Sequence, residues 1–533
     1  MNLHTMSLRA LLFLGLWHSG RRSLASAPQL GDQPKKIAVI GAGIGGTATA
    51  YYLRQEFGPG VKIDVFESGA VGGRLQTVKM GDYEYEVGGA VIHPLNLHMK
   101  HFVDKLGKSD HFQNTYISLP LQYYIIYNYF RYFPRKDVPS KIAIFNGKEL
   151  TFEESDWFII NFLQCLWRYG FNLLRMRMWV ESILDKFMRI YQYQQYGYSF
   201  SSVERLLHAM GGDSFVTLMN QTLEETMIGE GFSQVFLNDF VEPITRVNYG
   251  QSVRINGFVG AVSLAGADSG LWAVDGGNKK VCSGLLYSSK SELIPAKVTS
   301  IAVKVRPSKS GAAASFYEVN YVGEDGAAHS LYDIVMIATP LHQGKSDITF
   351  SGFSPPIPSH YPGRFHQTVT TLVHGLLNVS FLGTTEAASD FRVSDVLTTA
   401  SEVSIINSLS SLDPVHIPPG YKPSPASHRK VWKVFSPEPL TQEQLKSMFL
   451  SWDSVSETRW LAYPAYSPPQ RKTPPFILHK RLYYLNAVEW AASAMEMSAI
   501  SARNLALLAH HRWHNQDSKI DQEDLHTRLR GEL

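Results

Sequence analysis

Short apolar runs alternate with glycine-rich turns near the start of the chain. Residues 37–40 are four consecutive apolar residues, the pattern of a strand that is buried on both faces of a parallel sheet. Residues 47–53 follow with a helix-like pattern, and residues 61–66 form a second strand-like run. The pattern predicts a βαβ unit whose first turn holds the glycines of residues 41–46.

The hydrophobic pattern changes twice further along the chain. Between residues 155 and 251 apolar residues return every three or four positions, most clearly in 157–167 and 179–190, which predicts mostly helix. From residue 263 helical and strand-like segments alternate again. We expect a helix over 282–286, strands at 297–305, 332–340 and 481–486, and a long helix that begins within 493–500. Proline pairs at 355–356, 418–419 and 468–469 separate the strands of an expected mixed sheet.

The glycine spacing in the first turn has a chemical reason. Gly41 permits the tight turn, Gly43 lets backbone N–H groups approach a pyrophosphate, and Gly46 lets helix and strand pack closely. Gly45 lies in the same turn, at the helix end that favours an anion. Glu67 ends the second strand, where an acid accepts hydrogen bonds from an adenosine ribose and disfavours a 2′-phosphate. This unit predicts a dinucleotide site; the alternative is a tight turn without a ligand.

Two further glycine pairs follow the second strand. Gly72 and Gly73 precede Arg74, and Gly88 and Gly89 come one strand later. Because glycine has no side chain, a dinucleotide can approach its backbone closely, and arginine brings a permanent cation beside the dinucleotide. A nicotinamide enzyme has no need of either feature, so the pattern favours a different dinucleotide.

Composition and charge narrow the class of protein. The chain has 533 residues, enough for two or three interleaved domains, and a formal net charge of +3. Lys and Arg are scattered among acids without a basic stripe, so no nucleic-acid partner is expected. Aromatic residues make up 12%, which suits a large apolar interior or a pocket for an apolar ligand. With Cys165 and Cys282 as the only cysteines, we expect no disulfide framework and no metal site.

The first residues resemble a targeting segment. Arg9, an apolar run over 10–17 and a small-residue site at 25–27 predict a secretory signal peptide over residues 1–27, with a transit peptide as the alternative. Sequons at Asn220 and Asn378 would accept glycans on the secretory route.

The glycine motifs and Glu67 together resemble the FAD-binding segments of the flavin amine oxidase superfamily. Longer blocks are similar to one member family, the prenylcysteine oxidases. These blocks lie at residues 91–99, 152–157, 167–170, 178–181, 186–191, 246–252, 269–278 and 490–498. The resemblance extends from residue 36 to residue 533. Residues 111–134 depart from it and are interpreted as an insertion, either a membrane-facing loop or a misassigned exon.

The resemblance implies an α/β fold in which a Rossmann-type FAD-binding domain is interleaved with a mixed-sheet and helical substrate domain. The FAD-binding parts would be residues 36–104, 263–342 and 476–516. The substrate parts would be residues 146–262 and 343–475.

The same resemblance assigns three further cofactor contacts. It implies that the backbone of Val298 lies against adenine and that Glu489 contacts the ribityl chain or the pyrophosphate. Met495 would lie in the helix whose N–H groups face the flavin ring and stabilise its negative charge. Many relatives have glycine where this chain has Asn486 and Ala487, so the contact at Glu489 departs from the usual pattern.

The implied reaction is the oxidation of S-prenyl-L-cysteine, farnesyl or geranylgeranyl, on FAD. Hydride leaves the prenyl C1 carbon for the flavin, and water attacks the sulfur-stabilised cation. Collapse releases cysteine and a prenyl aldehyde, and molecular oxygen regenerates FAD and yields hydrogen peroxide. His93 would position water or accept a proton, with a purely structural histidine as the alternative.

The resemblance also implies a setting, the degradation of prenylated proteins in the lysosome, reached through the secretory pathway, with secretion also open. A peripheral association with membranes or lipoproteins would fit the prenyl substrate, and the oligomeric state stays open.

Two alternative functions remain. The chain could be a prenyl-binding protein without enzymatic activity, similar to the GDP dissociation inhibitors, or it could be an amine or polyamine oxidase. Glu67 and Arg74 count against the first. Peroxide release with farnesylcysteine but not with amines would exclude the second.

Overall fold

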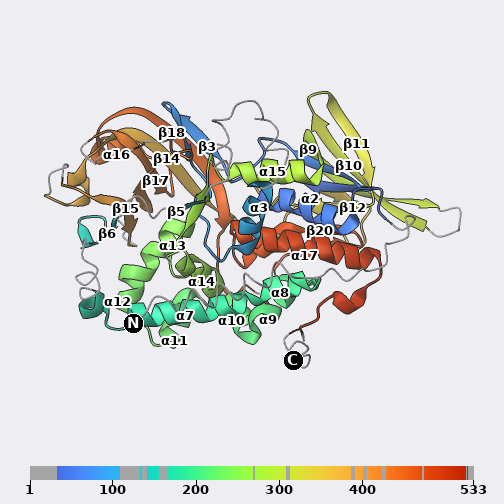
Figure 1. The fold of residues 1–533 in the computed structure, drawn as a ribbon, viewed down its shortest axis with the longest axis horizontal. Helices are drawn as coiled ribbons and strands as arrows, with labels where there is room; N and C mark the ends of the chain where they lie inside the picture. The colour runs from blue at the N-terminus through green and yellow to red at the C-terminus, as the bar shows by residue number, and fades with distance from the viewer. Residues whose placement is uncertain are drawn as a thin grey trace, which may run out of the picture. The chain divides into compact units, whose positions relative to one another are not determined.

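Five parallel strands form the centre of the larger sheet (Figure 1). In space they follow the order β9 (Glu292–Pro307), β2 (Lys62–Glu67), β1 (Lys36–Ile40), β12 (Ile334–Ile337) and β20 (Leu482–Tyr484). The strand order therefore reverses at β1, between β2 and β12. This is the doubly wound arrangement, in which ligands bind at the carboxyl ends of the strands beside the reversal. The predicted α/β fold of Rossmann type is confirmed.

The structure is a computed structural model, and the residues it describes are 33–107, 132–134, 141–154, 165–267, 270–307, 313–385, 390–399, 405–418, 421, 428–470, 473–523 and 525. The predicted signal peptide over residues 1–27 lies outside the described residues. So does the predicted insertion over residues 111–134, except for β5 (Tyr132–Pro134), which pairs with β8 (Trp272–Val274).

Further strands extend the larger sheet at both edges. β10 (Ala313–Gly323) and β11 (Gly326–Tyr332) continue antiparallel from β9, and β13 (Thr349–Ser351) also pairs with β9. At the other edge β19 (Ile477–His479) runs antiparallel to β20. The predicted strand at 297–305 is thus part of a longer strand that serves both the parallel and the antiparallel regions.

Helices from distant parts of the sequence cover the parallel strands. α2 (Ile44–Phe57) packs against both α15 (Lys279–Ser289) and α17 (Met495–Trp513), and Figure 1 shows the three lying side by side. α3 (Leu97–Gly107) packs on α15 and α17. The predicted helix at 282–286 is confirmed and extends by a turn or less at either end, because buried residues continue from Val281 to Ser289.

One strand prediction is partly wrong. The pattern of residues 481–486 predicts a strand, but β20 ends at Tyr484 and the chain continues as a 3-10 helix, η4 (Leu485–Trp490). All six residues of η4 are buried, including the polar Asn486 and Glu489, so burial continues across the change of conformation. Periodicity cannot separate a buried strand from a short buried helix. The turn redirects the chain from the end of β20 toward the start of α17.

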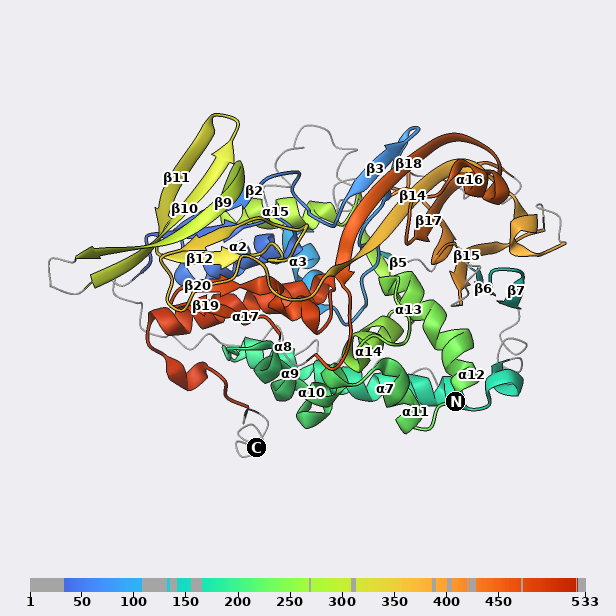
Figure 2. The same ribbon diagram turned by 180° about the vertical axis from the view of Figure 1, so that it is seen from behind.

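A second sheet contains seven strands, five of them from residues 343–475, the region in which we expect a mixed sheet. These five pair only antiparallel, and the sheet is mixed because a strand from residues 141–145 joins one of them in parallel. Figure 2 shows its two long strands, β14 and β18, running together. Its spatial order is β18 (Phe449–Pro464), β14 (Phe365–Leu377), β17 (Lys430–Ser436), β16 (Ser408–Ser411), β15 (Val393–Thr398), β6 (Lys141–Phe145) and β7 (Leu150–Glu153). β15 and β6 are parallel, and the other neighbours are antiparallel. One face packs on α16 (Gln442–Met448) and η3 (Val379–Leu382).

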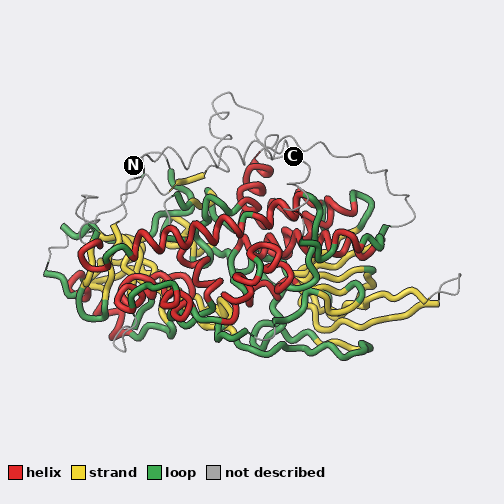
Figure 3. Tube along the Cα trace, turned by 90° about the horizontal axis from the view of Figure 1, so that it is seen from below, coloured by secondary structure: helices red, strands yellow, loops and turns green. Residues whose placement is uncertain are grey.

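A helical layer accounts for most of the described residues between 165 and 265, as predicted. Its helices are α7 (Asn172–Phe187), α8 (Arg189–Gln195), α9 (Val203–Gly211), α10 (Asp213–Asn220), α11 (Leu223–Gly229), α12 (Gln234–Phe236), the π-helix η2 (Leu237–Val241), α13 (Glu242–Tyr249) and α14 (Gly257–Ala265). In Figure 3 the strands form separate groups and helices occupy the space between them. Residues 155–164, part of the predicted helical region, lie outside the described residues.

A short hairpin completes the fold near the site. β3 (Thr77–Met80) and β4 (Tyr83–Glu86) pair with each other and separate the two downstream glycine pairs.

Candidate functional site

A cavity of about 750 Å³ opens at the carboxyl ends of β1 and β12, where the strand order reverses. Most of the predicted site residues line it. They are Gly41, Gly43, Gly45, Glu67, Gly72, Gly73, Arg74, Gly88, Gly89, His93, Val298 and Met495. Gly46 and Glu489 are buried and are not part of this lining. Tertiary structure therefore gathers residues from four separated segments into one cavity.

The first glycine turn has the geometry of an anion site. The first backbone hydrogen bond within α2 runs from the Thr47 N–H to the Gly43 carbonyl (3.0 Å), so the N–H groups of residues 44–46 precede it. A Cβ on Gly43 would have no heavy atom closer than 3.8 Å. A Cβ on Gly46, by contrast, would lie 1.8 Å from the Gly41 carbonyl oxygen. Gly43 leaves space toward the cavity, and Gly46 allows the helix to approach the strand.

The three glycine motifs pack directly on one another. Gly43 and Gly72 form a parallel β-bridge, and the Gly72 N–H donates to the Ala42 carbonyl (3.0 Å). The Gly89 N–H donates to the Arg74 carbonyl (3.2 Å), and a Cβ on Gly88 would lie 1.8 Å from that oxygen. Side chains at these glycine positions would occupy the space through which a ligand approaches the backbone. The result is a cradle of backbone that fits a dinucleotide pyrophosphate.

Glu67 lies at the cavity edge and organises the loop around it. Its Oε2 accepts a hydrogen bond from the Ala42 N–H (2.8 Å), and its Oε1 accepts one from the Gly69 N–H (2.8 Å). Each carboxylate oxygen has further acceptor capacity, so these bonds leave room for a ribose hydroxyl. Val298 lies on β9, next to β2, and lines the same end of the cavity. Ribose and adenine contacts stay predictions.

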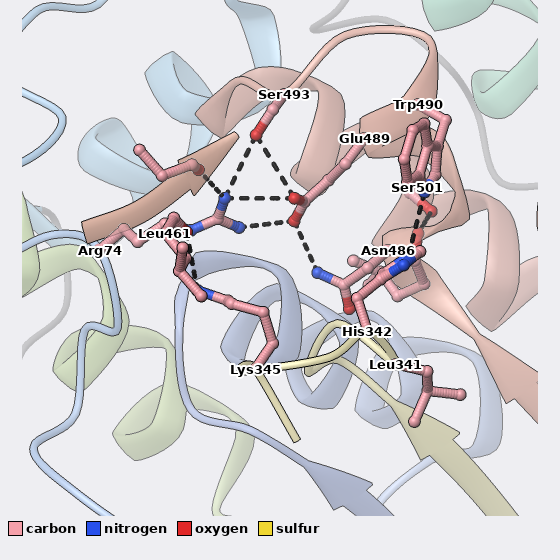
Figure 4. Close-up of polar contacts among 12 residues, drawn as sticks. Arg74, Leu341, His342, Lys345, Leu461, Asn486, Glu489, Trp490, Ser493 and Ser501 are labelled. Carbon is pink, nitrogen blue, oxygen red and sulfur yellow. Dashed lines mark hydrogen bonds and ion pairs between the residues drawn. The ribbon is translucent and has the colours of Figure 1, made fainter. Parts of the chain in front are cut away.

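An ion pair between a half-buried arginine and a fully buried glutamate joins the first and last parts of the site (Figure 4). The Arg74 Nη2 lies 2.5 Å from Glu489 Oε1, and its Nη1 lies 3.1 Å from Oε2. Glu489 is fully buried and also accepts a hydrogen bond from the Asn486 amide (2.6 Å). The resemblance placed Glu489 on the ribityl chain or the pyrophosphate. In the structure Glu489 lies behind Arg74 and orients its guanidinium, which is the group at the cavity.

Lys345 is a second cation at this wall, and the sequence analysis missed it. Its Nζ donates to the Leu461 carbonyl (2.9 Å), as Figure 4 shows. Burial and the nearby charge of Arg74 lower the pKa of Lys345 to about 8, against an opposing effect of Glu489. The same burial acts on Arg74, but Glu489 raises the pKa of Arg74 above its ordinary value. Lys345 lies in no glycine motif, so no local signal identifies it.

Asn278 and Glu86 hold the second glycine pair in place. The Asn278 backbone N–H donates to Glu86 Oε1 (2.7 Å), and the Asn278 side chain donates to the Gly89 carbonyl (2.8 Å). Burial raises the pKa of Glu86 to about 7, although the Asn278 hydrogen bond and the charge of Lys433 lower it. Asn278 thus connects α15 to the cavity wall.

The start of α17 brings a second helix N-terminus to the cavity. The first hydrogen bond of this helix runs from the Ser498 N–H to the Ala494 carbonyl (3.0 Å), so the N–H groups of residues 495–497 precede it. Met495 and Glu496 both line the cavity. Glu496 accepts hydrogen bonds from the N–H groups of His98 (2.7 Å) and Met99 (3.0 Å), which caps the start of α3. The positive ends of α2 and α17 therefore face one cavity, as expected for an anionic dinucleotide.

His93 lies on the cavity wall and makes a hydrogen bond within its own turn. Its Nδ1 accepts a hydrogen bond from the Leu95 N–H (3.1 Å), so a neutral imidazole carries its proton on Nε2. The expected roles of His93 are to position water or to accept a proton. A neutral ring with its proton on Nε2 fits a group that positions water or donates a proton better than a proton acceptor, and it also fits a structural turn residue. The catalytic role stays a prediction.

An apolar compartment forms the opposite part of the cavity. Its lining residues on α7 and α14 share a lack of polar atoms and are Val180, Ile183, Leu184, Phe187, Phe258, Ala261, Val262 and Ala265. A wall of this kind excludes water and fits an apolar ligand.

The remaining candidate residues lie away from the cavity. Asn220 is exposed at the end of α10, and Asn378 is half-buried before η3. Each side-chain amide donates to a backbone carbonyl, of Val216 (3.1 Å) and Ser447 (2.9 Å) respectively. Glycosylation stays a prediction.

Both cysteines are buried, and no metal-ligating cluster accompanies them in the described ranges. Cys165 and Cys282 are both free and buried, and burial raises the pKa of the Cys282 thiol to about 12. Within the described ranges we find no cluster of three or more metal-ligating side chains. Nor does any helix in those ranges have the length and apolar character needed to cross a membrane.

The ion pair predicts strong coupling between its two members. Arg74→Met leaves the fully buried Glu489 carboxylate without its cation and should cost about 3–5 kcal/mol of unfolding free energy, whereas Glu489→Met should cost less because the Arg74 side chain is 32% exposed. The double variant should lose less than the sum of the single losses, as measured by urea unfolding. The control is Arg177→Met, because Arg177 and Glu181 form an exposed pair (3.1 Å) whose loss should cost under about 1 kcal/mol. Additive losses at Arg74 and Glu489 would contradict the coupling.

The raised pKa of Glu86 predicts a pH-dependent difference in stability. Glu86 loses its proton near pH 7 in the folded state, above its ordinary value of 4.5, so its contribution is present in acid and is lost as the pH rises through 7. Glu86→Gln keeps an acceptor for the Asn278 N–H without the charge. Urea unfolding should show similar stability of the variant and the unmodified protein at about pH 4, below the ordinary pKa, and an advantage of the variant of about 1–3 kcal/mol at about pH 8. Parallel pH profiles would contradict the prediction.

Sequence comparisons agree with this site. The model of the prenylcysteine lyase family matches residues 152–522, and that of an NAD(P)-binding Rossmann-like domain matches residues 39–106. Prenylcysteine oxidase 1 of Mus musculus is 50% identical over 524 residues, which cover 98% of each chain. The Homo sapiens protein is 50% identical over 505 residues, with 95% of this chain and 94% of the relative covered. Prenylcysteine oxidase 1-like of Homo sapiens is 43% identical, with 96% and 97% covered.

Solved structures with low sequence identity share the fold. A triple mutant of putrescine oxidase superposes with a TM-score of 0.54 at 14% identity, covering 89% of this chain and 98% of the other. Cyclohexylamine oxidase from Brevibacterium oxydans gives a TM-score of 0.53 at 14% identity, covering 90% and 99%. The length and identity of the sequence matches, together with the cradle and its two helix ends, show that the chain belongs to the prenylcysteine lyase family, has the flavin amine oxidase fold and uses a flavin cofactor.

Proposed function

We propose that the protein is an FAD-dependent oxidase that cleaves S-prenyl-L-cysteine to free cysteine, a prenyl aldehyde and hydrogen peroxide. The observation that carries the proposal is the joining of a dinucleotide cradle to an apolar compartment in one cavity. The chain in which this occurs is half identical to prenylcysteine oxidases over almost its full length. A farnesyl or geranylgeranyl group is the apolar ligand that the compartment would take.

FAD is the flavin form that the residues of the cradle support. Gly43 and the N-terminus of α2 would receive the pyrophosphate, Glu67 the ribose, and the N-terminus of α17 the flavin ring. When bound, the flavin accepts a hydride from the prenyl C1 carbon and passes the electrons to molecular oxygen. The protein's own part is to hold the substrate carbon against the ring and to keep bulk water away.

The apolar compartment would supply most of the binding energy. Burial of hydrocarbon contributes about 0.8 kcal/mol per CH₂ group, so half of roughly fifteen prenyl carbons would give about 6 kcal/mol before the costs of association. Val180, Ile183 and Phe187 on α7 and Phe258 on α14 offer that surface. His93 would supply the proton on its Nε2 to the departing sulfur, or hold the attacking water.

The setting belongs to the same proposal. We place the protein in the lysosome, reached through the secretory pathway, with a secreted fraction. The pattern of residues 1–27 and the sequons at Asn220 and Asn378 support this route.

An exposed apolar stripe supports contact with a lipid surface. Trp167, Phe171, Leu174 and Met178 are 92%, 69%, 55% and 61% exposed. Leu174 and Met178 are four residues apart on α7, Phe171 is the residue just before that helix, and Trp167 lies in a separate helical segment that ends before Gly170 (φ 58°). α7 continues into the wall of the apolar compartment. A stripe of this kind, with exposed arginines such as Arg175 beside it, fits the surface of a membrane or lipoprotein that contains anionic lipid.

The reaction is tested by mixing the purified protein with S-farnesyl-L-cysteine under anaerobic conditions. We expect the absorption of the oxidised flavin to bleach, and in air we expect peroxide with farnesylcysteine but not with putrescine. Peroxide with amines alone would favour an amine oxidase. A folded but colourless protein would favour a prenyl-binding protein without catalysis.

A substitution in the first glycine turn tests the assigned pyrophosphate site. Gly43→Val should keep the fold, since Gly43 has a φ of −72° and a Cβ there would meet its nearest neighbours at an ordinary van der Waals distance (3.8 Å), but should lose flavin and activity. The matched control is Gly60→Val, because a Cβ on Gly60 meets no heavy atom within 4 Å and Gly60 is remote from the cavity. Normal flavin content in Gly43→Val would contradict the assigned pyrophosphate site.

The lipid contact is tested by sedimentation with vesicles of phosphatidylcholine and phosphatidylserine. We expect the protein to bind them, and we expect the variant Trp167→Ser/Phe171→Ser to bind at least about tenfold more weakly, since both side chains carry large apolar areas. Activity on micellar farnesylcysteine should be unchanged in this variant. Equal vesicle binding by both proteins would contradict the proposal.

A further inference from the structure

A polar row on the second sheet forms a third wall of the cavity. Strand register places Asp395 on β15 opposite Ser410 on β16, and Ser410 opposite Lys433 on β17. All three line the cavity. Their chain neighbours Val396, Leu409 and Trp432 belong instead to the apolar core on the other face of the sheet. Because side chains alternate along a strand, the three polar groups face the cavity together.

The row presents opposite charges at its two ends. Lys433 is only 7% exposed, and its Nζ lies 4.9 Å from the centre of the Phe435 ring, which also lines the cavity. Asp395 and Ser410 are half-buried. Neighbouring strands are about 4.8 Å apart, so the backbones at Asp395 and Lys433 are separated by roughly 10 Å. A small ligand group can lie over Ser410 with an ion-pair partner on either side.

The other charged groups of the lining do not offer this arrangement. Glu67 and Arg74 belong to the dinucleotide cradle. Lys297 and Asp347 form an exposed pair (3.5 Å) beside Val298, at the end predicted for adenine. Glu496 is held by the N–H groups at the start of α3. Lys345 lies near Arg74 and donates to the Leu461 carbonyl (2.9 Å). Of the charged lining residues in the described ranges, Asp395 and Lys433 are the pair on the sheet wall.

The hairpin before Gly88 and Gly89 brings this wall next to the cradle. The Thr370 hydroxyl on β14 donates to the Val87 carbonyl (3.1 Å), and Thr370 pairs with Phe435 in the sheet. Lys433 is also close enough to Glu86 for its charge to lower the pKa of that carboxyl. The polar row therefore lies beside the glycine pair that the sequence places near the flavin, where the substrate sulfur would be.

We propose that Lys433 binds the α-carboxylate and Asp395 the α-ammonium of the substrate cysteine, with the Ser410 hydroxyl between them. The inference rests on the proposed function and identifies how its substrate is recognised. A zwitterion requires one cation and one anion at short separation, and charge-assisted hydrogen bonds are the strong ones. The prenyl chain takes the apolar compartment, and the amino-acid end takes this wall. Capping either charge of the substrate removes one contact.

The test compares S-farnesyl-L-cysteine with its methyl ester and its N-acetyl derivative. Lys433→Met should raise KM for the free acid about tenfold or more while leaving KM for the methyl ester unchanged. Asp395→Asn should raise KM for the free amine by a similar factor while leaving the N-acetyl derivative unchanged. Flavin content and anaerobic bleaching at saturating substrate should persist in both, because neither residue belongs to the cradle. The control is Lys446→Met, since Lys446 is exposed on α16, which packs on the other face of the same sheet.

A further variant keeps the test informative if Lys433→Met or Asp395→Asn does not fold. Ser410→Asp adds a carboxylate to the middle of the row and should raise KM for the free acid more than for the methyl ester. Equal effects on all three substrates, or none, would overturn the assignment of the polar row. If the unmodified protein does not bleach with any prenylcysteine, the proposed function itself fails, which is a different result from turnover that is insensitive to Lys433 and Asp395.

Discussion

The bidentate ion pair between Arg74 and Glu489 is the interaction on which the site depends. It connects the loop after β2 to η4, two segments more than four hundred residues apart in sequence. Arg74 also donates to the Ala462 carbonyl (2.6 Å), so β18 of the second sheet is held at the same point. A buried carboxylate without its cation would be strongly unfavourable. The pair therefore fixes the relative positions of both sheets where the cavity opens.

Near this ion pair, part of the cavity wall is formed by backbone atoms instead of side chains. Gly43, Gly72 and Gly88 allow three loops to pack within van der Waals distance and leave their N–H groups and carbonyls as the surface. Backbone groups do not change charge with pH and lose no side-chain entropy when a ligand binds. With the N-termini of α2 and α17 directed at the same cavity, the electrostatic preference for an anionic dinucleotide is built into the fold itself.

The cavity is divided by the chemistry of its walls. The cradle is polar backbone, the surfaces of α7 and α14 are apolar, and the wall formed by β15, β16 and β17 carries charges of both signs. These three kinds of wall correspond to the three parts of the proposed ternary complex, which are the flavin dinucleotide, the prenyl chain and the amino acid. The apolar wall excludes water and thereby strengthens the ionic contacts beside it.

The sequence by itself determined the parts of the protein whose cause is local. The strand of residues 37–40, the glycine turn at 41–46 and the helix beginning at Met495 follow from periodicity and from positions where only glycine fits. Tertiary structure alone decided that Glu489 faces Arg74, that η4 interrupts the run expected to be a strand, and that Lys345 reaches the cavity wall. It also decided the polar row, because Asp395, Ser410 and Lys433 become neighbours only through the register of three strands. The hydrophobic pattern of a single strand does not show which distant strand it pairs with, so local patterns cannot reveal the pairing.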